Sequence, residues 1–156
     1  MANCRKYEVV ISNTPPAAST TVPIAGINGA ATCRLRIYGI ELGSDTAPAN
    51  ASASYQIARI TTALSGGTAV TPGKLDSGDP ASTSSAMQGP SITAPTITAN
   101  SQVWQGALNQ NNSIQRFFPD GYELVAPATA NNGFCLLPAT ITGTAFNVVG
   151  SLFFTE

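Results

Sequence analysis

Residues 65–85, SGGTAVTPGKLDSGDPASTSS, concentrate charged side chains in a chain that has few of them. Lys74, Asp76 and Asp79 lie close together there, among glycines, prolines and hydroxyl side chains. Two carboxylates at one tight turn could bind Ca²⁺, but a calcium-binding loop needs oxygen ligands at alternating positions and a closing glutamate. A proline and an alanine follow Asp79 instead. The segment therefore favours an aspartate-stabilised turn over a metal site.

The chain contains no histidine, which excludes a Ser-His-Asp triad, histidine-based zinc sites and the usual general base near neutral pH. A pair of carboxylates, as in glycosidases, is the enzymatic alternative that remains. The pairs Glu41 with Asp45 and Asp120 with Glu123 flank a strand end and a turn, without aromatic neighbours that would position a sugar. We therefore predict a protein that is not an enzyme and has no catalytic residue, metal or cofactor.

Trp104, in SQVWQGALN, is the only tryptophan. It could form a stacking platform for a sugar or a base, but no second aromatic residue stands two positions away to widen such a platform. Packing in the core or in an interface is the simpler prediction.

Charged residues make up 10% of the chain, against roughly 25% in typical soluble domains, and the net charge is −1. So little charge repulsion favours a protein that works as an assembly. The seven Lys and Arg residues are scattered, which argues against nucleic acid as a partner. No apolar run approaches the ~18 residues of a membrane span, and Cys4, Cys33 and Cys135 are too widely spaced for a disulfide framework. We expect a chain made in a reducing cytoplasm, with no membrane segment.

Apolar and polar residues alternate with a period of two, as in half-buried strands. The phase shifts by one residue at Gly39, which predicts a β-bulge there. The sequence PDG at 119–121 predicts a tight turn with a positive φ at Gly121. The expected strands lie within 6–11, 32–42, 54–64, 91–98, 101–109, 113–118, 122–126, 133–137 and 145–154. These segments predict an all-β chain, a single jelly-roll-like β-sandwich domain (1–156) of about eight antiparallel strands.

Three stretches between the strands, 12–32, 43–53 and 65–90, are long and rich in Ser, Thr, Ala, Pro and Gly. Such stretches bury too little apolar surface to become ordered alone, so we expect a neighbouring subunit to order them. The N-terminal segment 1–12 and the loop 65–90 are the predicted inter-subunit arms. Phe117 and Phe118, like Phe153 and Phe154, are successive strand residues, so the two rings of each pair point to opposite faces of the sheet. One ring of each pair thus faces away from the core, and we expect another subunit or a loop of the same chain to shield it from water.

The order of the segments NCRKYEVVIS, CRLRIYGIELG, YQIARITTALSGGTAVTPGKLDSGDPAS and GSLFFTE resembles that of head decoration or cement proteins of tailed bacteriophages. The resemblance implies a β-sandwich body with extended arms, assembled as a homotrimer on the lattice of the major capsid protein at the virion surface. It brings no catalytic residues.

On this interpretation, loop 65–90 is a binding arm that clasps a partner. The residues expected to contact a partner are Arg5, Lys6, Lys74, Asp76, Asp79 and Trp104. One alternative is a tail or fibre module that binds a receptor or a polysaccharide, which would require an exposed aromatic platform. A small glycosidase that uses the acid pairs above is a further alternative.

Overall fold

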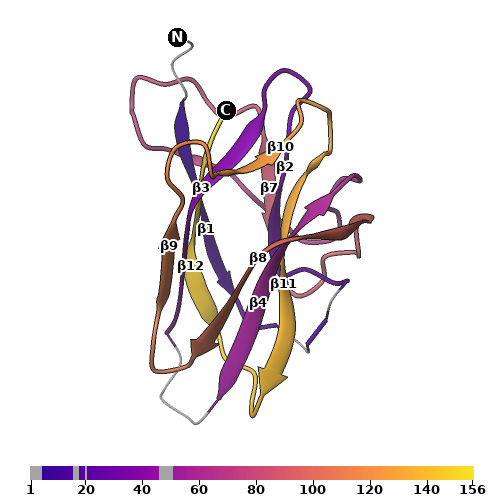
Figure 1. Ribbon diagram of the computed structural model, residues 1–156, viewed down its shortest axis with the longest axis vertical. Helices are drawn as coiled ribbons and strands as arrows, with labels where there is room; N and C mark the ends of the chain where they lie inside the picture. The colour runs from indigo at the N-terminus through magenta and orange to yellow at the C-terminus, as the bar shows by residue number, and fades with distance from the viewer. Residues whose placement is uncertain (1–4, 16–17, 20, 46–50) are drawn as a thin grey trace.

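The alternating segments form two antiparallel sheets, which pack face to face in the computed structural model (Figure 1). The structure describes residues 5–15, 18–19, 21–45 and 51–156. It confirms the predicted all-β fold, a β-sandwich. Cys4 and part of the predicted arm 1–12 lie outside the described residues.

The first sheet has the strand order β10-β3-β12-β1-β6, and β9 also pairs with β3. Its strands are β1 (Lys6–Asn13), β3 (Leu35–Ser44), β6 (Gly73–Lys74), β9 (Ile114–Phe117), β10 (Leu124–Ala126) and β12 (Val148–Thr155). Since β9 and β10 lie along the same side of β3, the loop between them projects from that edge of the sheet.

The second sheet has the order β5-β7-β2-β11-β4-β8. Its strands are β2 (Ala25–Asn28), β4 (Ser52–Ile60), β5 (Thr68–Val70), β7 (Ser85–Gln88), β8 (Ile97–Asn109) and β11 (Gly133–Thr142). The predicted strands 91–98 and 101–109 contribute to one strand, β8, whose pairing with β4 shifts register twice. The described residues thus form twelve strands rather than about eight, because the low-complexity stretches contribute β2, β5, β6 and β7.

The predicted change of phase at Gly39 is confirmed as a β-bulge. Phe153 pairs with Gly39 and Phe154 pairs with Ile37, so that Tyr38 is the extra residue on β3. The bulge keeps Ile37 and Ile40 buried on the same inner face, although they lie an odd number of positions, three, apart along the chain. The predicted PDG turn is also present, with Gly121 at φ 88° and a hydrogen bond from the Tyr122 N–H to the Pro119 carbonyl.

Two apolar clusters stabilise the sandwich. The main core lies between the sheets and includes Tyr7, Ile57 and Phe134. The second cluster lies on the outer face of the second sheet, where Leu64 and Ile92 cover residues such as Cys135. The chain therefore covers the outer face of its second sheet with its own segments.

Tyr55 carries a buried polar group that gives a first testable prediction. Its side chain is fully buried, and its hydroxyl has no hydrogen-bond partner within the described part of the chain. A buried hydroxyl without a partner costs roughly 1–3 kcal/mol in desolvation. We expect Tyr55→Phe to raise the free energy of unfolding by about 1 kcal/mol in urea titrations. A loss of stability in this variant would contradict the prediction.

Candidate functional site

The predicted arm 65–90 is held in place by its own chain. Its residues form β5 and β7 in the second sheet and β6 in the first, where Lys74 pairs with Tyr7 of β1. The Leu75 N–H donates to the Lys6 carbonyl, at 3.0 Å. Strands of the same chain therefore suffice to order this stretch, and the expected neighbouring subunit is not required for it. Its role as a partner-binding arm stays a prediction.

The turn that follows β6 is built as the sequence predicts. The Gly78 N–H donates to Asp76 Oδ1 at 2.8 Å, and the Asp79 N–H donates to the Asp76 carbonyl at 3.1 Å. Lys74 Nζ closes the turn by donating to the Ser77 carbonyl at 3.0 Å. These bonds use the charged side chains to shape the loop. No group of three or more metal-ligating side chains occurs among the described residues.

Glu156 fastens the far side of this loop. Its carboxylate accepts hydrogen bonds from the Thr83 N–H at 2.7 Å and from the Ser84 hydroxyl at 2.8 Å. The Tyr7 hydroxyl adds a bond to the Pro80 carbonyl, at 3.2 Å. We call the unit made of segment 73–84 and these anchors the clasp. Figure 1 shows it folded over the end of the sandwich where β1 begins and β12 ends.

The pKa of Glu156 predicts a pH dependence of stability. Burial alone would raise this pKa, but hydrogen bonds from Thr83, Ser84 and Ser82 outweigh it and lower the pKa below the ordinary 4.5. Because the folded state holds the proton less tightly, the contribution to stability is present above pH 4.5. It is lost as the pH falls through the lowered pKa of the folded state.

We therefore expect Glu156→Gln to lose about 1–2 kcal/mol of stability at pH 7, a moderate amount because the carboxylate is partly exposed. The difference between the variant and the parent should shrink as the pH falls through the lowered pKa of Glu156. Urea titrations at pH 7 and at a series of lower pH values measure this difference. Glu41→Gln, a change in a strand glutamate outside the clasp, is the control and should alter stability by less than about 0.5 kcal/mol.

The structure brings five of the six predicted contact residues to one end of the molecule. Arg5 precedes β1 and Lys6 begins it, beside Lys74, and Asp76 and Asp79 lie in the adjoining turn. The sixth residue lies elsewhere: Trp104 is on β8 of the second sheet, partly buried against the core, with its ring over Gly106. Trp104 packs as the sequence predicts and is not part of the clasp.

A pocket of about 460 Å³ adjoins the start of β1 on the outer face of the first sheet. The loop between β9 and β10 forms its other wall. Its lining residues are Lys6, Arg36, Tyr38, Phe118, Asp120, Gly121, Glu123 and Thr155. The pocket thus combines two cations, two carboxylates and two aromatic rings. One of the predicted acid pairs, Asp120 with Glu123, lies in it, and Glu123 accepts a hydrogen bond from the Gly121 N–H at 2.8 Å.

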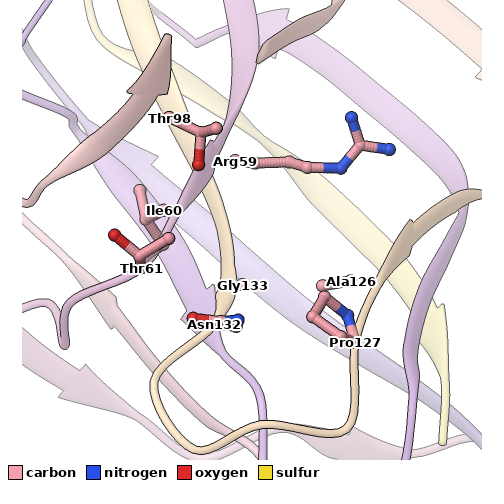
Figure 2. Close-up of a pocket in the computed structure, with 8 residues that line it drawn as sticks. All are labelled: Arg59, Ile60, Thr61, Thr98, Ala126, Pro127, Asn132 and Gly133. Carbon is pink, nitrogen blue, oxygen red and sulfur yellow. The ribbon is translucent and has the colours of Figure 1, made fainter.

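A smaller pocket, of about 210 Å³, lies between the two sheets near the turn that precedes β11 (Figure 2). Arg59 of β4 extends toward the side formed by Ala126 and Pro127. Its Nε donates to the Val125 carbonyl at 3.3 Å, and its guanidinium lies 5.8 Å from the centre of the Phe134 ring. These contacts join the second sheet to β10 of the first. The volume is below the roughly 300 Å³ typical of ligand pockets, so Arg59 serves the structure.

Three aromatic side chains form a surface cluster that the sequence did not predict as a unit. Phe117 and Phe153 meet above Gly39 with ring centres 5.6 Å apart, and Tyr38 lies 6.1 Å from Phe153. We call Tyr38, Phe117 and Phe153 the aromatic row. Phe117 and Phe153, the outward residues of the two predicted pairs, thus cover one another in part.

No family model, curated protein or solved structure matches the chain. The resemblance to decoration proteins therefore stays an expectation. The described residues include no helix that could cross a membrane.

Proposed function

We propose that the chain is a non-enzymatic structural protein of a phage virion, a decoration or cement protein that binds and stabilises the lattice of the major capsid protein. The protein would be made in the host cytoplasm and would lie on the outer surface of the capsid. The observation that carries this proposal is the clasp, which holds Lys74, Asp76 and Asp79 beside Arg5 and Lys6 on one ordered end of the sandwich.

The clasp is already ordered in the isolated chain, which favours tight binding to a partner. Arms that become ordered only on contact lose affinity to conformational entropy, whereas this one is held in advance by Tyr7, Glu156 and the pairing of β1 with β6. The net charge of −1 gives little electrostatic repulsion between neighbouring copies. Many copies bound to one lattice also turn modest single contacts into a firm attachment. The resemblance adds that the protein assembles as a homotrimer, an expectation that a mass measurement tests directly.

Co-sedimentation with shells assembled from the phage's own major capsid protein tests the proposal. Deleting the arm, for example residues 72–88, is not a clean test of its role in binding. The deletion would remove β7, an interior strand of the second sheet, and so damage the fold itself. The sharper variant is the triple change Lys74→Ala, Asp76→Ala and Asp79→Ala, which we expect to weaken binding at least tenfold. Gln105→Ala, an exposed change on β8, is the control. Unchanged binding by the folded triple variant, or no binding by the parent protein, would contradict the proposal.

A tail or fibre module that binds a polysaccharide is the second candidate. The 460 Å³ pocket favours it, because Tyr38 and Phe118 offer apolar faces while the charged side chains offer donors and acceptors for sugar hydroxyls. Titration of the ¹⁵N-labelled protein with purified surface polysaccharide of the host tests this candidate. Resonance shifts that map to the pocket and vanish in Asp120→Asn/Glu123→Gln would support it, and their absence would exclude it.

A further inference from the structure

The outer face of the first sheet is arranged in cross-strand rows. In the first row, Lys6 of β1, Thr155 of β12 and Arg36 of β3 are direct neighbours. The aromatic row follows, where Phe153 and Phe117 flank Gly39. In the third row, Val10, Ser151, Glu41 and Gln115 are neighbours from β1 to β9. A basic row and a row that contains Glu41 therefore lie on opposite sides of an aromatic centre.

This face exposes apolar surface beyond its first row, where the loop between β9 and β10 forms the wall of the 460 Å³ pocket. Phe117 is 48% exposed and Val10 is 58% exposed, although both lie within strands of the sheet. On the second sheet, by contrast, Leu64 and Ile92 cover the outer apolar residues. Exposed apolar side chains with a polar rim mark interaction surfaces, and Phe117 continues here into the partly exposed rings of Phe153 and Tyr38.

We propose that this face binds the same face of a second copy of the chain, about a two-fold axis that runs along the aromatic row. A face that opposes itself requires such an axis. The rotation keeps each strand opposite its own copy but reverses its direction. The aromatic rows of the two copies then stack on one another, and the first row of each copy opposes the third row of the other.

The charges match under this operation. Arg36 and Glu41 both lie on β3, on either side of the axis, so Arg36 of each copy faces Glu41 of the other and the ion pair forms twice. Glu8 lies at the β1 end of the aromatic row and opposes its own copy. It accepts a hydrogen bond from Ser151, and Lys6 of the second copy lies diagonally opposite, displaced by two residues, or about 6.6 Å, along the strand direction. The long lysine side chain can span that distance.

The size of the face indicates a reversible dimer. Four strands spaced about 4.8 Å apart, over the length of three rows, present roughly 300–400 Å² in projection. This is less than the roughly 800 Å² that each partner buries in a standard interface, so we expect dissociation constants in the micromolar range. The contact leaves the clasp free, because the clasp lies at the end of the sandwich and not on this face.

Sedimentation equilibrium of the purified full chain, at concentrations from about 1 µM to 1 mM, measures this association without any capsid protein. Arg36→Glu and Glu41→Arg each place like charges together, and we expect each variant to dissociate at least tenfold more readily. The double variant restores both pairs in reversed polarity and should return to within about threefold of the parent. Arg34→Glu, an exposed change just before β3, is the matched control and should leave the association unchanged.

The variant Phe117→Ser keeps the test decisive if a charge-reversed strand fails to fold. It shortens an already exposed side chain at the centre of the contact and should also weaken the dimer at least tenfold. A protein that stays monomeric up to 1 mM, a trimer, or a dimer indifferent to the single charge reversals would overturn the proposal. Capsid binding is measured separately through the clasp variants, so failure of the dimer leaves capsid binding to its own test. A confirmed dimer would replace the homotrimer that the resemblance implies.

Discussion

Replacing Gly150 with alanine is expected to destabilise the protein by about 3 kcal/mol or more, a large effect for a single methyl group. Gly150 lies on β12 opposite Leu42 of β3. A Cβ atom at Gly150 would overlap the main-chain carbonyl of Glu41. Because the obstacle is backbone and not a flexible side chain, β3 and β12 would have to move apart at the centre of the first sheet.

Gly43→Ala is the matched control for this change. Gly43 lies on β3 opposite Val149, and the nearest atom to an added Cβ there is 3.8 Å away, at ordinary contact distance. Both variants replace glycine with alanine within one pair of strands, so their difference isolates the overlap. Urea titrations with a common slope measure it. Equal stability of the two variants would show that β3 and β12 are further apart than described here.

Tyr7→Ala is expected to lose about 3–5 kcal/mol, because Tyr7 connects the core to the clasp. Its ring is fully buried and stacks on Phe154 with centres 5.4 Å apart. Truncation to alanine would leave a cavity between the sheets. It would also remove the hydroxyl that donates to the Pro80 carbonyl.

Tyr7→Phe separates these two roles. It keeps the buried ring and removes only the hydroxyl, so we expect a loss of about 1 kcal/mol. Amide hydrogen exchange should then quicken in segment 73–84 but not in β11. A uniform rise in exchange over the whole chain would contradict the assignment of the Tyr7 hydroxyl to the clasp.

The long strands could be predicted because their signal is local. On β1, Tyr7, Val9 and Ile11 alternate with Lys6, Glu8 and the exposed Val10, and each of the first three is fully buried. The bulge on β3 was predictable for the same reason, since the apolar phase changes at Gly39 within one segment. Periodicity and turn chemistry both act over a few residues, and a single sequence records them.

The short strands could not be predicted, because they depend on partners far along the chain. Thr68–Val70 and Gly73–Lys74 have no apolar alternation, and they are strands only because β7 and β1 lie beside them. The aromatic row was hidden in the same way. Tyr38, Phe117 and Phe153 come from three strands, and only the pairing of β9 and β12 with β3 brings the rings together.

The division of segment 65–90 between the two sheets has a mechanical consequence. A pull on the turn between β6 and β7 meets unequal resistance at its two ends. On one side, β6 is attached to β1 by two residue pairs. On the other, β7 is attached to β2 by four pairs and to β5 by three. We expect β6 to detach from β1 first under load, while the two sheets stay packed together. The clasp would then open at a lower force than the force that unfolds the sandwich.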